Sequence, residues 1–384
     1  MIYTPTPQWN SKLATLVVEL SGLRNHSVSG SSPAWLFFEL KDLFHIVEAL
    51  SSARIEGNHT TLATFVEKKL DKTDTDNEKL IEISNLIEAL EFVDQHIATT
   101  DIDANLLFEL HRIVVKNLST DHGGEGDTRP GAYRLDERHI GNSDHILPHP
   151  ADIRDLMDEL YAYINEENDP QMDLLKIAIA HHRFVWIHPF GNGNGRTVRL
   201  LTYAMLCKKG FITPGVARLF NPTAVFAGDR NKYYDNLAVA DKLDEASLLQ
   251  WCEYVLGGLK EEVEKSQKLS DYEFVKDNIL LPTFVWAQEK NITNEIETKI
   301  LNRIARKATI KAGDIKNLWP EDYSHVVVSK QLRKMKSQNF ITTLKPNGRE
   351  YILQLTSNKL TRGILDRMEA ENMLPIRVDE TAES

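Results

Sequence analysis

Apolar residues recur every three or four positions along much of this chain, which is the spacing of an amphipathic helix. Four such stripes predict helices over residues 40–57, 153–164, 174–185 and 194–210. Residues 120–148, between the first and second of these helices, are rich in Gly, Asp and His and predict a loop with a short hairpin. We therefore expect a mainly α fold.

The pattern changes in residues 291–354, where short elements follow one another closely. The expected elements are helices at 296–306, 312–318 and 324–338 and strands at 340–344 and 351–355. The two strands are separated by a predicted turn at Pro346-Asn347-Gly348. Three helices followed by a β-hairpin are typical of a winged helix-turn-helix domain.

Composition and charge exclude several classes of protein. The 384 residues are 42% hydrophobic and 26% charged, which excludes a fibrous or wholly disordered chain. The net charge of −11 argues against indiscriminate binding to nucleic acid or acidic membranes. With only Cys207 and Cys252, the chain has no disulfide framework or thiolate metal cluster. We see no signal peptide and no apolar run of roughly 20 residues, so we expect a soluble cytoplasmic protein without membrane contact.

The segment from His188 to Arg199, His-Pro-Phe-Gly-Asn-Gly-Asn-Gly-Arg-Thr-Val-Arg, gives the strongest indication of chemistry. Its three glycines precede a predicted helix, whose N-terminus offers unpaired N–H donors to an anion. Arg196 and Arg199 suit a ligand with several phosphates, and His188 could remove a proton from an attacking hydroxyl. The structural alternative is a glycine-rich turn with surface arginines. The segment is not a Walker loop, because no Gly-Lys-Ser/Thr follows.

These twelve residues resemble the signature of the Fic-domain family, His-x-Phe-x-(Asp/Glu)-Gly-Asn-Gly-Arg-x-x-Arg. Flanking segments agree with the resemblance: Gly131-Ala-Tyr-Arg134 lies upstream, and Asp144-His-Ile-Leu-Pro148 lies where the family has its flap. The resemblance covers about residues 35–260. It implies a helical bundle with a β-hairpin flap that transfers AMP from ATP to a Ser, Thr or Tyr hydroxyl of a target protein.

The resemblance also implies a role for each part of the site. His188 would be the general base for the target hydroxyl. The flap would lie over the ATP substrate and align an extended target segment by β-augmentation. The residues implied to bind the nucleotide are Asn142, Ser143, Asp144, His145, Asn192, Gly193, Asn194, Gly195, Arg196, Arg199, Tyr233, Tyr234, Leu237 and Asp241.

Asn192 departs from the family signature, which usually has Asp or Glu here to bind Mg²⁺. An amide oxygen can bind Mg²⁺ but has no negative charge, and magnesium prefers carboxylates and phosphates. One interpretation is a tolerated variant in which Asn192 binds the metal with weaker metal dependence. The alternatives are a different nucleotide or metal preference, or a much reduced transfer activity.

A second family signature, (Ser/Thr)-x-x-x-Glu-(Gly/Asn), is matched by Ser52-Ala-Arg-Ile-Glu56-Gly57. In Fic proteins with this signature, the glutamate pairs with the second arginine of the motif and blocks productive placement of the γ-phosphate. A helix ending at Gly57 would place Glu56 at its negative end, where a carboxylate is disfavoured by about 0.3–1 kcal/mol. A contact with Arg54 or simple solvation is the alternative. The resemblance therefore implies that Glu56 is inhibitory and that Ser52 assists by capping or packing.

Charge separates the C-terminal region from the rest of the chain. Residues 291–354 contain 12 Lys and Arg against 6 Asp and Glu, which predicts a domain boundary near residue 285. With the resemblance, four parts are expected. They are an N-terminal helical region over 1–100 with the inhibitory helix near 40–57, the Fic catalytic core over 101–285, the winged helix over 286–355, and a C-terminal helix and acidic tail over 356–384.

The basic residues of the expected winged helix suggest one partner. Lys330, Arg333 and Lys334 share one side of its third helix, and with Lys345 and Arg349 they could contact DNA phosphates. Winged helices also serve in protein contacts and dimerisation, and Lys-rich helix faces are usually just solvated. DNA and a second copy of the chain are therefore both possible partners of this region.

Three functions agree with the sequence. The first is a self-inhibited protein adenylyltransferase that modifies a target protein or itself. The second is a Fic enzyme that moves another phosphate-containing group or removes AMP, with Glu56 orienting water. The third is a weakly catalytic regulator that binds ATP and acts on DNA or a protein through the winged helix.

Overall fold

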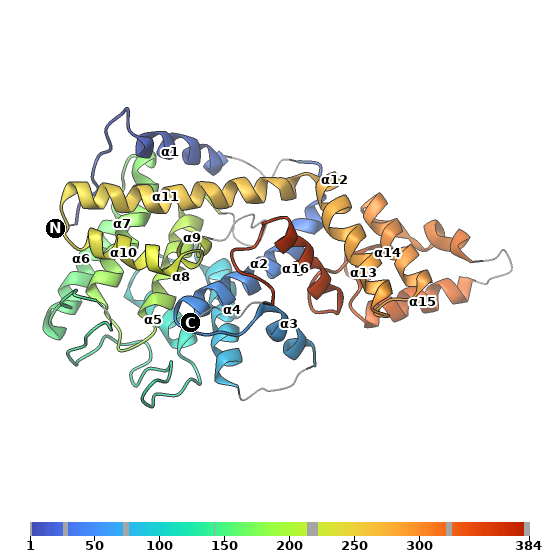
Figure 1. The fold of residues 1–384 in the computed structure, drawn as a ribbon, viewed down its shortest axis with the longest axis horizontal. Helices are drawn as coiled ribbons and strands as arrows, with labels where there is room; N and C mark the ends of the chain where they lie inside the picture. Colours follow the sequence, from blue (N-terminus) through green and yellow to red (C-terminus); the bar gives the residue numbers. More distant parts are fainter. Residues whose placement is uncertain are drawn as a thin grey trace. The chain divides into compact units, whose positions relative to one another are not determined.

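The structure is a computed structural model that describes residues 2–25, 30–71, 77–141, 143–212, 222–319 and 325–379 (Figure 1). These residues group into two compact units. Unit 1 comprises described residues within 1–27, 45–60 and 75–264, and unit 2 those within 28–44, 61–74 and 265–384. The two long helices α2 (Ala34–Ile55) and α11 (Glu245–Gln267) contribute residues to both units. The four domain limits expected from the sequence stay predictions.

Unit 1 is helical and is built around α7 and α8. Its other helices are α1 (Lys12–Ser21), α4 (Glu78–His96), α5 (Ala104–Val114), α6 (Ile153–Asn165), α9 (Ala224–Ala227) and α10 (Arg230–Ala240), with 3₁₀ turns at Gly22–Asn25, Pro150–Asp152 and Pro170–Met172. Helix α7 (Asp173–Ile187) packs on α6 and α8, and α8 (Asn194–Lys208) packs on α4, α5 and α7. The side chains of α8 are buried almost all round, so this helix forms the centre of the core.

The four helices predicted from the apolar stripes are confirmed as α2, α6, α7 and α8. Helix α2 begins earlier than predicted and ends at Ile55, and Gly57 follows it with a φ of 102°. Glycine adopts this left-handed conformation without a steric cost, which is why the helix stops here.

The predicted hairpin within residues 120–148, the family's flap, is wrong for the described residues, none of which lies in a strand. The Ser143 N–H donates to the Ile140 carbonyl at 3.3 Å, so the chain turns there without forming a ladder. Asn142 lies outside the described residues. An isolated two-stranded hairpin is marginally stable, and Gly, Asp and Pro favour turns over strands. We keep the name flap for residues 140–148.

Unit 2 combines helices with a small antiparallel sheet. Its remaining helices are α3 (Leu62–Asp71), α12 (Tyr272–Val275), α13 (Leu281–Glu289), α14 (Glu295–Lys307), α15 (His325–Ser337) and α16 (Leu360–Ala370), with a π-helical stretch at Lys276–Leu280 and 3₁₀ turns at Lys268–Ser270 and Ala312–Leu318. The sheet has the order β1-β3-β2, from β1 (Ile310–Lys311), β2 (Ile341–Thr343) and β3 (Glu350–Leu353). Thr343 of β2 and Ile310 of β1 both pair with Tyr351 of β3.

The elements predicted for residues 296–355 therefore occur in the expected order, with two differences. The predicted helix over 312–318 is a 3₁₀ turn, and the two-residue strand β1 was not predicted because it is too short for a periodic pattern. Ser324 and the tail from Glu380 onward lie outside the described residues. No helix that the structure describes combines the length and the apolar composition of a membrane span.

The basic residues of this region are not equivalent. Lys334 Nζ lies 2.7 Å from Glu297 Oε1 of α14, so this ammonium group already has an anionic partner. Lys330, Arg333, Lys345 and Arg349 are exposed.

Candidate functional site

The loop between α7 and α8 positions His188. Helix α7 ends at Ile187, and His188 reverses the chain in the left-handed conformation with φ 50° and ψ 61°. Gly193 has a φ of 73° and caps the N-terminus of α8. The first turn of α8 therefore begins six residues after the histidine, with its free N–H groups at the start of the helix.

Buried contacts hold this loop in place. The ring of Phe190 stacks on His111 at 3.9 Å with an interplanar angle of 3°. The side chain of Asn194 accepts from the Phe190 N–H and donates to the Phe190 carbonyl, both at 2.9 Å. Asp127 Oδ2 accepts from the Asn192 N–H at 2.9 Å. The loop is thus fixed by its own sequence and by a carboxylate from the segment that precedes the flap.

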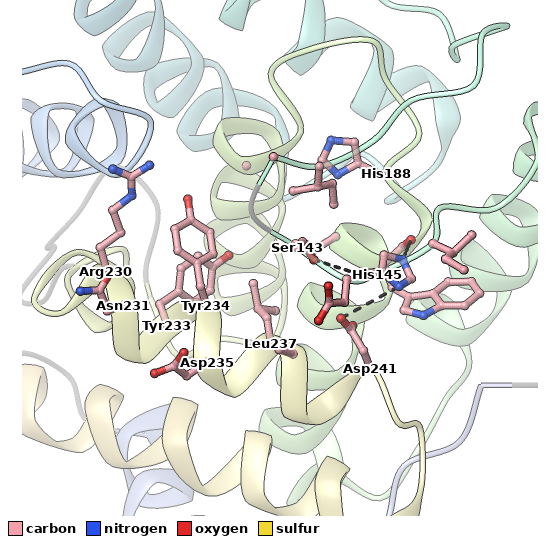
Figure 2. A pocket seen from close by; sticks show the side chains of 18 of the residues that line it. Ser143, His145, His188, Arg230, Asn231, Tyr233, Tyr234, Asp235, Leu237 and Asp241 are labelled. Carbon is pink, nitrogen blue, oxygen red and sulfur yellow. Dashed lines mark hydrogen bonds and ion pairs between the residues drawn. The ribbon is translucent and has the colours of Figure 1, made fainter.

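A cavity of about 1130 Å³ lies in front of this loop. Figure 2 shows residues of α10 along one side of it, with His188 and the flap residues Ser143 and His145 across from them. The site residues expected from the sequence that line the cavity are Glu56, Ser143, Asp144, His145, His188, Gly195, Arg199, Tyr233, Tyr234, Leu237 and Asp241. Glu56, which directly follows α2, therefore meets residues of the flap, α7, α8 and α10 in one space.

Five other expected residues are not among those that line this cavity in the described structure: Ser52, Asn192, Gly193, Asn194 and Arg196. Ser52 still contacts the site, because its Oγ accepts from Arg199 Nε at 2.8 Å and its carbonyl accepts from Nη2 at 3.0 Å. The side chain of Asn194 is used within the loop, as described above.

Glu56 and Arg199 form an ion pair inside the cavity. Arg199 Nη2 lies 2.7 Å from Glu56 Oε1. A methyl group placed on Gly195 would overlap this oxygen, so the carboxylate fills the space directly in front of the first turn of α8. Burial would raise the pKa of Glu56, but Arg199 and Arg196 together hold it below its usual value. A carboxylate therefore occupies the position where a helix N-terminus and a guanidinium would hold an anion.

Arg196 has different surroundings. Its Nη1 donates to Glu82 Oε1 at 3.0 Å, and its Nη2 donates to Glu125 Oε2 at 2.7 Å and to the Glu125 carbonyl at 3.0 Å. The arginine side chain is 1% exposed. Its guanidinium is thus directed into the protein and away from the cavity.

His188 is suited to accept a proton. Burial lowers its pKa to about 4, and the positive charge of Arg134 acts in the same direction. A hydrogen bond with the backbone of Val185 acts in the opposite direction. The ring is therefore neutral at neutral pH, and because His188 lines the cavity it can act as a base toward a group there.

Residues 101–206, from just before α5 to near the end of α8, match the Fic/DOC family. This region is similar to Fic/DOC domains. The resemblance expected from the sequence is confirmed for this stretch. The chain is 31% identical over 206 residues to a protein from Culex quinquefasciatus named protein adenylyltransferase Fic, and 30% identical over 198 residues to a protein of that name from Drosophila melanogaster.

These alignments are partial. They cover 52% of this chain and 38% of the Culex protein, and 50% of this chain and 37% of the Drosophila protein. The chain thus spans less than two fifths of the length of these relatives. Its fold resembles the crystal structure of a Fic family protein from Desulfovibrio desulfuricans, with a TM-score of 0.57 and 20% identity over 91% of this chain and 98% of that one. It also resembles a Fic-1 fragment from C. elegans, with a TM-score of 0.50 and 22% identity over 66% and 71% of the two chains.

Asn192 does not offer a fitting Mg²⁺ ligand in this arrangement. Its Oδ1 accepts from the Gly193 N–H at 2.7 Å and lies 3.4 Å from Arg196 Nη2. Its Nδ2 donates to the carbonyls of Gly124 and Gly126 at 3.0 and 3.2 Å. A cation at Oδ1 would meet a guanidinium, and within the described ranges no three His, Cys, Asp or Glu side chains are grouped to hold a metal.

The α10 side of the cavity is held by buried histidines. Tyr233 is buried, and its hydroxyl is 2.9 Å from His181 Nε2. Asp241 Oδ1 is 2.8 Å from His182 Nε2, and Asp241 Oδ2 is 4.0 Å from Nδ1 of the flap residue His145. These contacts connect α10, α7 and the flap around the cavity.

Sequence reasoning missed several residues of the site. Arg230 and Trp186 line the cavity, and Glu82 and Glu125 contact Arg196. Arg134, which the sequence indicated only as part of a flanking segment, contacts the loop. Helical spacing could have found Arg230, because it precedes Tyr234 by four positions and Leu237 by seven on α10. Glu82 and Glu125 belong to no recognisable motif, so no signal in the sequence indicated them.

Proposed function

We propose that this chain is a self-inhibited protein adenylyltransferase that transfers AMP from ATP to a Ser, Thr or Tyr hydroxyl of a target protein. The observation on which the proposal rests is the cavity in which His188, the first turn of α8 and Arg199 face one another. A base, the N–H donors of a helix N-terminus and a guanidinium are the groups that nucleotidyl transfer needs. The Fic/DOC match and the names of the relatives support the same function.

In the proposed reaction, the target hydroxyl oxygen forms a bond to the α-phosphorus of ATP. The bond between that phosphorus and the oxygen bridging to the β-phosphate breaks, and pyrophosphate leaves. The hydroxyl proton passes to the neutral ring of His188. The N–H groups at the start of α8 stabilise the negative charge that develops on the α-phosphate.

Glu56 would keep the enzyme inactive. Its carboxylate occupies the space in front of Gly195 and binds Arg199, so an anionic phosphate and this carboxylate cannot both be there. Replacing Glu56 would leave the guanidinium and the helix N-terminus free for ATP. The flap, whose described residues form no ladder of their own, would then align an extended segment of the target by β-augmentation.

The test uses the full chain with Glu56→Gly, incubated with lysate proteins and with ATP labelled at either the α- or the γ-phosphate. We expect at least about tenfold more protein-bound α-label than with the parent chain, because one charge-assisted contact is removed. His188→Ala should abolish the label. Glu109→Gln is the matched control, because Glu109 forms a 2.7 Å ion pair with Arg112 on the exposed side of α5.

Each other outcome indicates a different function. Label from the γ-phosphate alone would indicate phosphorylation. No label on any hydroxyl-bearing protein, including the chain itself, would contradict the proposal and favour the ATP-binding regulator.

Removal of AMP from a modified protein is the second candidate, because Glu56 and His188 line the same cavity and Glu56 could orient a water molecule. In that case Glu56→Gly would abolish the release of label from AMP-modified proteins instead of raising its incorporation.

A further inference from the structure

Arg134 lies buried where three backbone segments meet beside His188. Its Nε donates to the His188 carbonyl at 2.9 Å, its Nη1 to the Asp136 carbonyl at 2.9 Å, and its Nη2 to the Pro148 carbonyl at 2.8 Å. Its backbone N–H donates to the Pro189 carbonyl at 2.8 Å. The residue is 3% exposed. One side chain therefore connects the catalytic loop to the segment before the flap and to the end of the flap.

The two flap contacts lie at its base. The chain leaves the guanidinium at Asp136, runs through the flap and returns to the same guanidinium at Pro148. Farther along, His145 Nε2 lies 2.9 Å from the Trp186 carbonyl of α7. Because the described flap residues form no ladder, these polar contacts take over the role that strand pairing has in a hairpin.

The contact to His188 holds an unusual backbone conformation. His188 has a positive φ, which costs free energy for a residue with a side chain and persists only when its surroundings fix it. The hydrogen bond from Arg134 fixes the carbonyl of this residue, and the adjacent carbonyl of Pro189 is held by the Arg134 backbone. The direction of the imidazole into the cavity thus depends on Arg134.

The charge of Arg134 has no ion-pair partner among the described residues, and one carboxylate, that of Glu137, acts on it from a greater distance. Among the described residues, its guanidinium donates to backbone carbonyls, and no carboxylate lies within ion-pair distance, unlike Arg196 and Arg199. Of the charged groups facing His188, Arg134 and His145 lower its pKa and Glu56 raises it, while burial has the largest effect. The positive charge of Arg134, which no ion pair offsets, therefore adds to the effect of burial on the base.

We propose that Arg134 is a positioning residue, which fixes the flap relative to His188 and whose positive charge adds to burial in opposing protonation of the imidazole. This inference rests on the proposed adenylyl transfer. It predicts that Arg134 affects the rate of proton transfer more than the binding of ATP, because Arg134 is not among the residues that line the cavity.

The test compares Arg134→Met and Arg134→Lys, each made in the Glu56→Gly chain. Arg134→Met removes the charge and all three donors, whereas Arg134→Lys retains the charge but cannot reproduce the planar fork of donors. Arg138→Met is the matched control, because Arg138 lies in the same segment, is 48% exposed and is 3.9 Å from Asp136. The readouts are kcat and KM for ATP, and the NMR titration of the His188 ring, identified by its loss in His188→Ala.

We expect Arg134→Met to lower kcat by at least about tenfold while KM for ATP changes by less than about twofold. It should also move the titration midpoint of His188 to higher pH. Arg134→Lys should lower kcat but leave the midpoint near that of the parent. Arg138→Met should change neither quantity.

An unchanged midpoint in Arg134→Met, or an unchanged kcat in Arg134→Lys, would overturn the proposal. If Arg134→Met does not fold, Arg134→Lys alone tests the proposal, which requires a lower kcat together with an unchanged titration midpoint of His188. The titration needs no substrate. A chain that transfers no AMP but shows the expected shift would therefore disprove the proposed function and leave the effect of Arg134 on His188 intact.

Discussion

Arg196 and Arg199 lie about one turn apart on α8, and their side chains are 1% and 2% exposed, yet the two arginines face different surroundings. Arg199 meets the cavity and pairs with Glu56, whose side chain is 26% exposed. Arg196 is bound by Glu82, which is buried, and by Glu125 from the segment before the flap. The two arginines of one motif therefore have different surroundings. Arg199 lines the cavity and is paired with Glu56, whereas Arg196 is part of the protein interior.

The largest expected effect is on stability, and it separates the two arginines directly. Arg196→Met leaves the buried Glu82 carboxylate without its cation, which should lower the free energy of unfolding by about 3–5 kcal/mol. Arg199→Met leaves Glu56 beside the cavity, where water can solvate it, so we expect less than half of that loss. Urea denaturation of the full chain measures both.

A second replacement tests the cause of this loss. Adding Glu82→Gln to Arg196→Met removes the unpaired charge and should restore most of the stability. Arg112→Met, at an exposed pair, should change stability by no more than about 0.5 kcal/mol. Equal losses for Arg196→Met and Arg199→Met would contradict the distinction between the two positions.

The next effect concerns Asn192, which lies on the Arg196 side of the loop. Its amide Nδ2 donates to the carbonyls of Gly124 and Gly126, so the carboxylate of Asn192→Asp would face two acceptors. We expect a loss of about 1–3 kcal/mol in the free energy of unfolding and faster amide hydrogen exchange in residues 119–131. Unchanged stability and unchanged exchange would show that these two hydrogen bonds do not hold the segment.

The sequence predicted the surroundings of Arg199 but not those of Arg196. Helix α8 and its apolar positions were evident from the spacing, and the Glu56–Arg199 pair was implied by the family resemblance. The partners of Arg196 were not, because Glu82 and Glu125 are 114 and 71 residues away along the chain and belong to no motif. The hairpin was predicted wrongly for a different reason, since an isolated two-stranded hairpin is marginally stable and Gly, Asp and Pro favour turns over strands.

The next smaller effect is on the affinity for ATP, which should respond to the partner of Arg199 and not to the partner of Arg196. Glu56→Gln removes the anion from the cavity, so the affinity for ATP should rise by about tenfold, while the affinity for adenosine stays within about twofold. Glu125→Gln should change the affinity for ATP by less than about twofold, because Arg196 is directed away from the cavity. Isothermal calorimetry with both ligands measures these values, and an equal gain for the two variants would show that Arg196 is accessible to phosphate.

The smallest expected effect is on the pH dependence of stability, and it distinguishes Glu56 from Glu82. Burial would raise the pKa of Glu56, but Arg199 and Arg196 hold it below its usual value. Burial raises the pKa of Glu82, and Arg196 offsets only part of that rise. Ionised Glu56 therefore stabilises the fold above the usual carboxyl pKa of about 4.3, and this contribution is lost as the pH falls through the lowered value. Glu82 has the opposite sign, because the folded chain binds its proton more tightly than the unfolded chain does.

Urea denaturation across the range from about pH 7 to about pH 3 tests these signs. The free energy of unfolding of the parent minus that of Glu56→Gln should be constant above about pH 5 and should fall at lower pH. The same difference for Glu82→Gln should increase as the pH falls toward about 4.3, because protonated Glu82 no longer opposes folding. Parallel pH profiles for the two variants would mean that both carboxyl groups have the same kind of environment. That result would contradict the distinction between Arg199 in the cavity and Arg196 in the interior.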